Sequence, residues 1–286
     1  MPELGRLIVC ATPIGNLGDV TLRVLDALRD ADSVAAEDTR VSKKLLMRYD
    51  IDTRLERCDE HTVERQTPAL IERMRGGEVI ALVSDAGTPG VSDPGSRLVD
   101  ACIEAGVPVE VLPGASAILA ALVASGLPTH AFYFGGFLPR KAGERRRALE
   151  ALRVLDATLI FYESPNRSGA TLSAIAEVLP GRQAAMAREL TKLHEEIVRG
   201  SIDHVAAEVA SREHIRGEVV LVIGPPPRME RAPADAGDVR SRVDALVAEG
   251  ANRSTAVKLV AKELGVPRSE VYDIAHRSGS AEKPTP

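Results

Sequence analysis

Short apolar runs alternate with segments of helical periodicity along most of this 286-residue chain. The runs are rich in β-branched residues and are bounded by Gly, Pro or acidic residues: RLIVCAT, SVAAE, EVIALVSD, VPVEVLPG, AFYFGGF, ATLIFYES, QAAMAREL and RGEVVLVIG. Segments such as TLRVLDALRDA, SRLVDACIEAG and SGATLSAIAEVL lie between them. Strands that alternate with helices predict an α/β fold with mostly parallel sheets. The run EEIVRGSI, which closely follows QAAMAREL, predicts some antiparallel pairing late in the chain.

The chain is longer than one hydrophobic core usually supports, so more than one domain is expected. We place an N-terminal α/β domain over residues 1–112 and a second α/β domain over residues 113–224. The sheet of the second domain is expected to run from about Phe132 to Ile223.

The character of the sequence changes after the second domain. Residues 225–237 form a Pro-rich linker that can continue neither a helix nor a strand. Residues 238–278 predict a small domain of three short helices, joined at residues 250–252 and 265–267, and residues 279–286 are expected to be disordered. Helix, Gly-containing turn and helix is the pattern of helix-turn-helix modules, although a helical appendage for packing or dimerisation fits equally well.

Composition excludes several classes of protein. A net charge of -5 means that any contact with nucleic acid must come from a local basic patch. Cys10, Cys58 and Cys102 are too few and too widely spaced for a disulfide framework or a CxxC metal site. Cys10 and Cys102 lie in apolar runs and are expected to be small core residues. No signal-peptide pattern and no apolar run of membrane-spanning length is present, so we expect a cytoplasmic protein with no membrane partner.

Four loops rich in Gly, Pro and Asp follow predicted strands: ATPIGNLGD, VSDAGTPGVSDPG, LPGASA and FYESPNR. In open α/β sheets, ligands bind beyond the carboxyl ends of the strands, so these loops predict a large cleft shared by two sheets. In the second loop, Asp85 directly follows a strand and is a candidate ligand-binding residue. Asp93 either binds ligand too or caps the turn or the helix that begins near Gly95.

The loops lack the motifs of several common enzyme classes. ATPIGNLG contains Gly15 and Gly18 but no GxGxxG, and no GxxxxGK[ST] is present. The six histidines show neither HExxH nor HxH spacing, so no metal site is predicted. Ser116 in PGASA does not lie in a GxSxG elbow. Hydride transfer to NAD, nucleotide hydrolysis and zinc-dependent hydrolysis are therefore disfavoured.

A series of segments in order along the chain resembles one known family: LIVCATPIGNLGDVTLRVLDAL, VAAEDTRVSKKLL, ALVSDAGTPGVSDPG, VLPGASA, FGGFLPRK, LIFYESPNR, ARELTKLHEE and RGEVVLVI. This is the ribosomal RNA small subunit methyltransferase I family, within the tetrapyrrole methylase superfamily. The resemblance covers about residues 6–223, and AVKLVAKELGVPRSEVY is similar to the small C-terminal domain that many members carry. Cys10 departs from the family, in which a small aliphatic residue is more usual.

The resemblance implies a homodimer in which each chain has two tandem α/β domains of the tetrapyrrole methylase type. S-adenosylmethionine would bind in the cleft between these domains. The implied reaction is methylation of the ribose 2'-hydroxyl of a cytidine in the decoding region of small-subunit (16S) ribosomal RNA, with the RNA or the small ribosomal subunit as partner. The superfamily does not have the usual methyltransferase Rossmann fold, which agrees with the absence of a glycine fingerprint.

The resemblance also implies which residues bind the cofactor: Pro13, Asp85, Ala86, Gly87, Thr88, Ser116, Ala117, Tyr162, Glu163, Leu190, Gly217 and Glu218. For Gly87, turn geometry alone is an alternative explanation. Glu163 follows the apolar run LIFY and, if buried, needs a partner, either Arg167 or the ligand.

A ribose hydroxyl is a poor nucleophile at neutral pH, so a general base or a stabilising cation would help the reaction. The segments AAEDTR and CDEHTVE supply the catalytic candidates, in the order Asp38, Glu37, Arg40 and His61. Alternatively, residues 37–39 cap the following helix and His61 is a polar residue near another helix start. Asn16 and Asp19 in the first loop are further possibilities.

Residues 138–153 carry six basic and two acidic residues directly after FGGF. A solvated helical face is one explanation of this composition, and contact with RNA phosphates is the other. Looped or single-stranded RNA is the expected target, because a ribose within a duplex is hard to reach. The RNA-binding candidates are Arg140, Lys141, Arg145, Arg146 and Arg147, with Arg253, Lys258 and Lys262 in the C-terminal helices.

Two other functions fit the same scaffold. One is a precorrin-type tetrapyrrole C-methyltransferase, which the segment RKAGERRR, the motif AAEDTR and the helical tail argue against. The other is a non-catalytic RNA-binding protein, which the intact cofactor loops disfavour.

Overall fold

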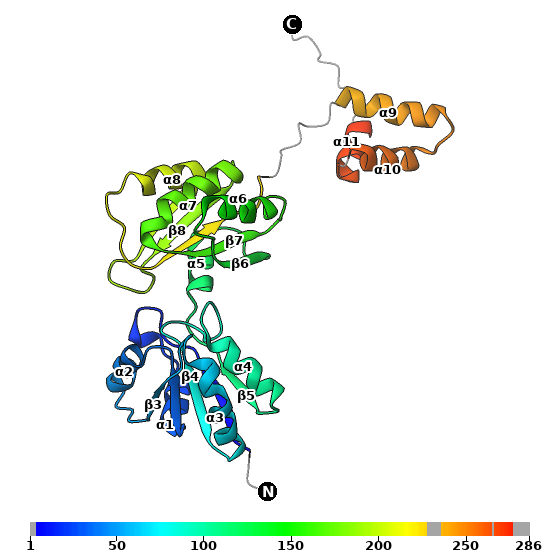
Figure 1. Ribbon diagram of the computed structural model, residues 1–286. Helices are drawn as coiled ribbons and strands as arrows, with labels where there is room; N and C mark the ends of the chain where they lie inside the picture. The colour runs from blue at the N-terminus through cyan, green and yellow to red at the C-terminus, as the bar shows by residue number, and fades with distance from the viewer. Residues whose placement is uncertain (1–3, 228–235, 265, 277–286) are drawn as a thin grey trace. The chain divides into compact units, whose positions relative to one another are not determined.

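The computed structural model describes residues 4–227, 236–264 and 266–276 (Figure 1). The chain divides into two compact units, Met1–Pro227 and Arg228–Pro286. The first unit contains two five-stranded sheets. Within the described ranges, no helix has the length and apolar character needed to cross a membrane.

The first sheet is entirely parallel, with strand order β3-β2-β4-β1-β5. Its strands are β1 (Arg6–Cys10), β2 (Ser33–Ala36), β3 (Leu55–Arg57), β4 (Val79–Val83) and β5 (Val109–Leu112). The helical segments between them are η1 (Leu17–Asp19), α1 (Leu22–Asp30), α2 (Thr39–Arg48), α3 (Val63–Arg75) and α4 (Gly95–Glu104).

Helices cover both faces of this sheet, which explains the continuous apolar runs of its strands. In β1, Leu7 and Val9 pack into one core cluster, whereas Ile8 and Cys10 pack into the cluster on the other face. Cys102 is also fully buried, so both cysteines are core residues as predicted. Because the strands are parallel, the loops that follow β1, β2, β4 and β5 lie at the same edge of the sheet.

The second sheet has the order β6-β7-β10-β8-β9. Its strands are β6 (Phe132–Phe137), β7 (Thr158–Glu163), β8 (Gln183–Arg188), β9 (Glu196–Ser201) and β10 (Val219–Ile223). Only β6 and β7 pair in parallel, and the other three pairs are antiparallel. The expectation of mostly parallel sheets is therefore wrong here, although the antiparallel pairing expected late in the chain is confirmed. The physical reason is that β8 and β9 are joined by a short connection, which antiparallel neighbours allow and parallel ones do not.

Four helices cover the second sheet. On one face, α6 (Ala142–Ala151), α7 (Pro165–Val178) and α8 (Ile202–Ala210) pack on the larger core cluster. On the other face, α5 (Ala117–Ser125), which connects the two sheets, buries Ala121 and Leu122. Because nearly every side chain of α5 is apolar, its outer face is apolar too, with Leu119 52% and Val123 72% exposed.

The first sheet ends at Leu112 and the second begins at Phe132. A domain boundary at residue 112 stays a prediction, because residues 1–227 cluster as one unit.

The second unit consists of α9 (Ala236–Ala248), α10 (Arg253–Leu264) and α11 (Arg268–His276), which confirms the three predicted helices. They enclose a core of their own, which includes Val243, Val257 and Val271. Helix α9 begins two residues before the predicted start of the helical domain at residue 238. Residues 228–235 of the linker and the predicted disordered tail 279–286 lie outside the described residues.

Candidate active site

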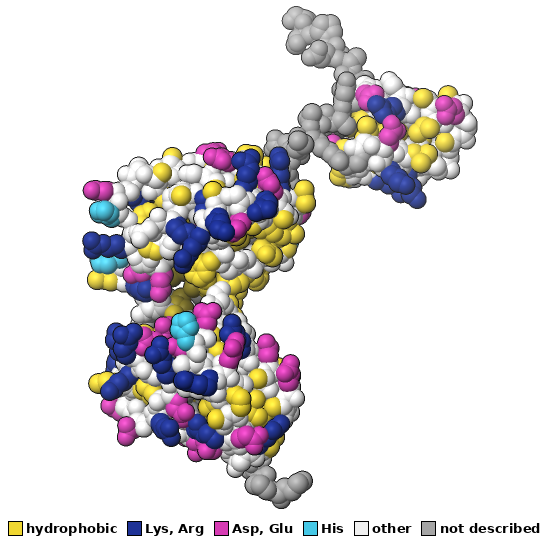
Figure 2. All heavy atoms as spheres, in the orientation of Figure 1, with side chains coloured by type: hydrophobic (Ala, Val, Ile, Leu, Met, Phe, Trp, Pro, Cys, Tyr) yellow, Lys and Arg dark blue, Asp and Glu magenta, His cyan; other side chains and the backbone are white. Residues whose placement is uncertain are grey.

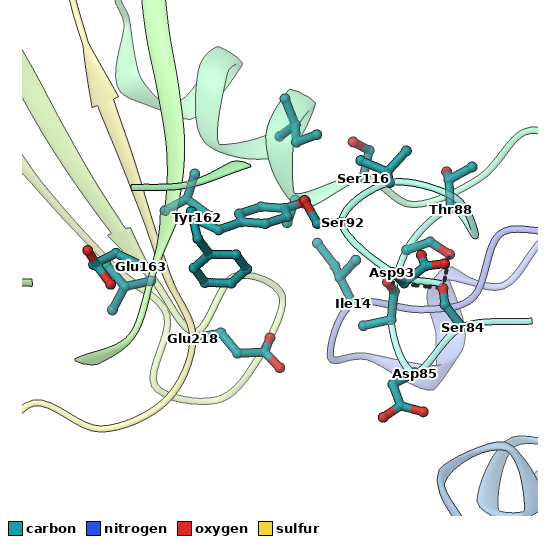
Figure 3. Close-up of a pocket in the computed structure, with 18 of the residues that line it drawn as sticks. Ile14, Ser84, Asp85, Thr88, Ser92, Asp93, Ser116, Tyr162, Glu163 and Glu218 are labelled. Atoms are coloured by element: carbon teal, nitrogen blue, oxygen red, sulfur yellow. Dashed lines mark hydrogen bonds between the residues drawn. The ribbon is translucent and has the colours of Figure 1, made fainter. Parts of the chain in front are cut away.

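A cavity of about 420 Å³ lies between the loops of the first sheet and the strand ends of the second. Figure 3 shows Tyr162 and Glu218, from the second sheet, across the cavity from Ser84 and Asp85. The residues that line it are Ile14, Glu37, Ser84–Thr88, Val91–Asp93, Ser116–Ile118, Phe137, Tyr162–Pro165 and Gly217–Val220. The cleft predicted from the Gly- and Pro-rich loops is therefore present.

The loop after β4 is held in place by hydrogen bonds. Thr12 and Gly87 exchange two backbone hydrogen bonds of 2.8 and 3.0 Å, which join this loop to the loop after β1. Gly87 has a φ of 80°, a conformation that side chains disfavour. Asp93 Oδ1 accepts hydrogen bonds from the N–H groups of Gly90 (2.8 Å) and Gly95 (2.7 Å). Asp93 thus closes the turn and also caps the start of α4, while still lining the cavity.

The charged side chains that line the cavity are all acidic. Its ionisable carboxylates are Glu37, Asp85, Asp93, Glu163 and Glu218, and no described Lys, Arg or His lines it. Burial raises the pKa of Glu37, and the nearby carboxylate of Asp85 raises it further. Burial also raises the pKa of Asp85. A positively charged ligand would relieve this repulsion, so the site is suited to a cation.

Nearly all of the predicted cofactor-binding residues line this cavity. The exceptions are Pro13, which is buried beside Thr12, and Leu190, which packs in a core cluster with Ile14. The sequence did not single out Phe137, although it ends the quoted run FGGF, nor Val220, which lies within a buried strand and carries no local signal.

The carboxylate of Glu163 is hydrogen-bonded and ion-paired within the protein. It accepts hydrogen bonds from the N–H of Ser164 (2.7 Å) and the hydroxyl of Thr171 (2.6 Å), and its side chain is fully buried. Arg167 forms an ion pair with it at 3.3 Å. Arg167 also donates to the carbonyl of Leu138 at 2.8 Å, which ties the cavity wall to the start of the basic segment. The partner required by a buried Glu163 is therefore Arg167.

Asp38, the first-ranked catalytic candidate, caps α2. Its carboxylate accepts hydrogen bonds from the backbone N–H (2.9 Å) and the guanidinium (2.6 Å) of Arg40. These bonds lower the pKa of Asp38 to about 2, which makes it a weak base. Glu37, by contrast, lines the cavity, and among the described residues its carboxylate accepts only one hydrogen bond, a 3.5 Å contact from the N–H of Asp85. The geometry favours Glu37 over Asp38 as a proton acceptor.

The remaining catalytic candidates do not line the cavity. Arg40 is exposed and paired with Asp38. His61 is exposed, and its backbone N–H donates to Asp59 at 3.2 Å. Asn16 caps η1 by accepting from the N–H of Gly18 at 3.0 Å, and Asp19 is exposed within that element.

The basic segment, residues 138–153, comprises α6 and the residues on either side of it, and many of its charges have partners. Lys141 pairs with Glu144 at 3.2 Å and Arg146 with Glu150 at 3.0 Å. Arg145 is half-buried and donates to the carbonyl of Arg140 at 3.3 Å.

The side chains of Arg140 and Arg147 are exposed and have no ion pair with any described residue. Figure 2 shows Lys and Arg side chains interspersed with Asp and Glu over α6 and α7.

In the C-terminal helices, Lys258 and Lys262 are exposed one turn apart on α10. Arg253 is engaged within that unit, because it donates to the carbonyl of Ala275 at 2.9 Å. In the part of the chain that the structure describes, no group of three or more His, Cys, Asp or Glu residues is arranged to hold a metal ion.

Residues 6–206 match the family model of Tetrapyrrole (Corrin/Porphyrin) Methylases. The chain is 44% identical to ribosomal RNA small subunit methyltransferase I of Halalkalibacterium halodurans. The 278 aligned residues cover 96% of each protein. It is 51% identical over 230 residues to the protein of that name from Mesorhizobium japonicum, covering 80% of this chain and 78% of the relative. The chain belongs to the ribosomal RNA small subunit methyltransferase I family.

Another member of the ribosomal RNA small subunit methyltransferase I family, from Hydrogenobaculum sp., is 47% identical over 219 residues, which are 76% of this chain but 95% of that relative. Solved structures support the fold. Uroporphyrin-III-C-methyltransferase from Thermus thermophilus superposes with a TM-score of 0.55 at 24% identity, covering 77% of this chain and 94% of that one. A diphthine synthase superposes with a TM-score of 0.60 at 18% identity, covering 77% and 90%. One Thermus thermophilus structure, with a TM-score of 0.54 at 20% identity and covering 77% and 97%, is described as complexed with S-adenyl homocysteine.

Proposed function

We propose that this protein transfers the methyl group of S-adenosylmethionine to the ribose 2'-hydroxyl of a cytidine in the decoding region of small-subunit ribosomal RNA. The observation that carries the proposal is the acidic cavity, because five carboxylates and no described basic residue line it. This charge suits a methyl donor that carries a sulfonium and an ammonium group. The names of relatives that are 44% and 51% identical support ribosomal RNA as the substrate.

The residues present also fit the other parts of S-adenosylmethionine. The first turn of α5, at Ala117 and Ile118, presents backbone N–H groups to a carboxylate end. Apolar side chains such as Ile14, Val220 and Phe137 offer walls for an adenosine. When bound, the cofactor supplies an electrophilic methyl group on sulfur. The protein's own residues then bind and orient both partners and receive the hydroxyl proton.

The basic segment of α6 is the proposed contact for the RNA backbone. It lies three residues beyond Phe137, which lines the cavity, and Arg167 anchors its start. Its exposed Arg140 and Arg147 are the cations best placed to neutralise phosphates. We place the protein in the cytoplasm, where it would meet the small subunit.

We also propose that the protein is a homodimer. The exposed apolar side chains Val111 on β5, Leu119 and Val123 on α5, and Phe132 and Tyr133 on β6 come from three consecutive elements. Exposed apolar residues that form one contiguous patch are typical of a protein interface, and we propose that these do so. A second copy of this chain is the partner that family resemblance implies.

One assay separates this function from its alternatives. The purified protein is incubated with labelled S-adenosylmethionine and, in turn, unmethylated small ribosomal subunits, naked small-subunit RNA and uroporphyrinogen. We expect label on the ribose of one cytidine in the subunits or the RNA. Label on the porphyrinogen instead would support the tetrapyrrole C-methyltransferase, and RNA binding without any transfer would support a non-catalytic protein.

A further inference from the structure

A second cavity, of about 490 Å³, adjoins the first. The residues that line it are Glu37, Glu60, Gly90, Ser92, Asp93, Pro94, Ser96 and Arg97. Glu37, Ser92 and Asp93 line both cavities, so the two meet at these three side chains. The second cavity has polar walls, whereas the first has many apolar ones.

We propose that the second cavity receives the target nucleotide and that Glu37, where the two cavities meet, accepts the proton of its ribose hydroxyl. This inference rests on the methyl transfer proposed above. An in-line displacement requires the attacking oxygen to lie next to the methyl group, on the side away from the sulfur. A cavity that shares a wall with the cofactor cavity meets this requirement, and its polar walls suit a ribose and a base.

Among the acids that line the cofactor cavity beside the junction, the carboxylate of Glu37 has the weakest hydrogen bonding, and Glu60 lines only the second of the two cavities. Asp93 Oδ1 accepts two backbone hydrogen bonds, and Asp85 Oδ1 accepts one from the N–H of Asp38 at 3.0 Å. The carboxylate of Asp38 is held by Arg40. Burial and the Asp85 carboxylate raise the pKa of Glu37, which brings proton transfer closer to neutral pH.

The atoms and electrons of the proposed methyl transfer balance. The hydroxyl oxygen forms a bond to the methyl carbon as the carbon–sulfur bond breaks, and the electrons of that bond remain on sulfur. The hydroxyl proton passes to the Glu37 carboxylate and from there to water. The products are a 2'-O-methyl ribose and S-adenosylhomocysteine.

Arg97 is the one cation among the described residues that line the second cavity. Its guanidinium pairs with Glu64 of α3 at 2.9 Å, and both side chains are largely exposed. A phosphate of the target nucleotide or its neighbour would compete with Glu64 for this guanidinium, so the contact is expected to be weaker than one made by an unpaired cation.

The test uses three measurements on the full chain: S-adenosylmethionine affinity by calorimetry, affinity for unmethylated small ribosomal subunits by filter binding, and the single-turnover rate of methyl transfer. Ser96 lines only the second cavity. We expect Ser96→Phe to fill this cavity and lower the transfer rate roughly 100-fold while cofactor affinity is retained. Glu104→Phe, which places the same aromatic side chain at the exposed end of α4, should change none of the three. Wild-type transfer by Ser96→Phe would overturn the proposal.

Glu37→Gln tests the proton acceptor. We expect a loss of roughly 10²- to 10⁴-fold in transfer with subunit affinity retained, and a much smaller loss of cofactor affinity because one carboxylate of the cofactor cavity is neutralised. In the wild type the rate should rise with pH through the raised pKa of Glu37, and this rise should be absent in Glu37→Gln. The charged groups that face Glu37 are Asp38 on its own segment, Asp85 and Asp93 in the loop after β4, and Glu60 and Arg97 across the second cavity. An unchanged pH profile would remove Glu37 from this role.

Arg97→Gln and Glu64→Gln form a matched pair, because both break the same ion pair but only the first removes the cation from the cavity. We expect only Arg97→Gln to weaken subunit binding, and equal losses would overturn its assignment to a phosphate. If Ser96→Phe fails to fold, as loss of cofactor binding would reveal, the Glu37 and Arg97 variants decide the proposal. A wild-type protein that transfers no methyl group to subunits would instead refute the proposed function.

Discussion

Asp85 and Glu37 carry carboxylates whose pKa values are raised in the folded protein, mainly by burial. A carboxyl group of this kind destabilises the folded state at a pH above its raised pKa, because the charged form is disfavoured there. Below its unfolded pKa the group is protonated in both states and the penalty vanishes. The two carboxylates therefore lower the free energy of unfolding at neutral pH, and binding of a cationic ligand would raise it again.

Replacing Asp85 tests this trade-off. We expect Asp85→Asn to raise the melting temperature at pH 7, and the gain to fade as the pH falls through the raised pKa of Asp85 and to be absent below the ordinary aspartate value of 3.8. The same variant should weaken S-adenosylmethionine binding by roughly ten- to a hundredfold, since a charged partner is lost. Thermal melts over a pH series and calorimetry measure the two effects. Asp100→Asn, at an exposed position on α4, is the control, and an unchanged cofactor affinity would remove Asp85 from the site.

Asp38 lies next to Glu37 in the chain, but its carboxylate is held by Arg40. Asn caps helices as well as Asp does, so Asp38→Asn should preserve α2. The lost ion pair with Arg40, whose side chain is 88% exposed, should matter little. We expect the single-turnover rate of Asp38→Asn to stay near the wild-type value. A loss as large as that of Glu37→Gln would make Asp38 the proton acceptor after all.

At the scale of elements, α6 combines two kinds of basic residue. Lys141 and Arg146 pair with acids one turn away on the same helix, whereas the side chains of Arg140 and Arg147 have no ion pair with a described residue. A cation that already has a partner on the surface gains less from a phosphate, because the existing pair must be given up. We therefore expect the segment to be a smaller RNA contact than its six basic residues in the sequence predict.

Gln substitutions can distinguish these two kinds of residue. Arg140→Gln with Arg147→Gln should lower RNA affinity more than Lys141→Gln with Arg146→Gln. The slope of log affinity against log salt should fall by roughly 0.7 to 0.9 for each lost phosphate contact. Cofactor affinity should not change, because this segment does not line the cavity. Wild-type affinity and salt slope in both double variants would show that α6 is only a solvated surface.

At the scale of the whole molecule, the proposed dimer depends on the outer face of α5. Val123→Glu places a charge at a position that is 72% exposed, so the fold should be retained while association is lost. Sedimentation equilibrium should then report a monomer. Leu193→Glu, at a 94% exposed position in the connection between β8 and β9, is the matched control and should leave the dimer intact. A dimer that survives Val123→Glu would place the interface elsewhere.

The sequence by itself determined the order of strands and helices apart from β3, the cavity-lining loops and the three C-terminal helices. These features follow from local causes: apolar periodicity, turn residues at strand ends, and the fact that parallel strands end at one edge of a sheet. Only the tertiary structure decided that β10 runs antiparallel between β7 and β8, because register and direction depend on partners distant in the chain. The tertiary structure also gave Asp38 and Glu37 different surroundings. Both residues directly follow β2. The carboxylate of Asp38 binds Arg40. The carboxylate of Glu37 instead contacts Asp85 in the loop after β4, and Glu37 lines the same cavity as Arg97 of α4. Contacts of this kind depend on how elements pack, and no local pattern in the sequence records them.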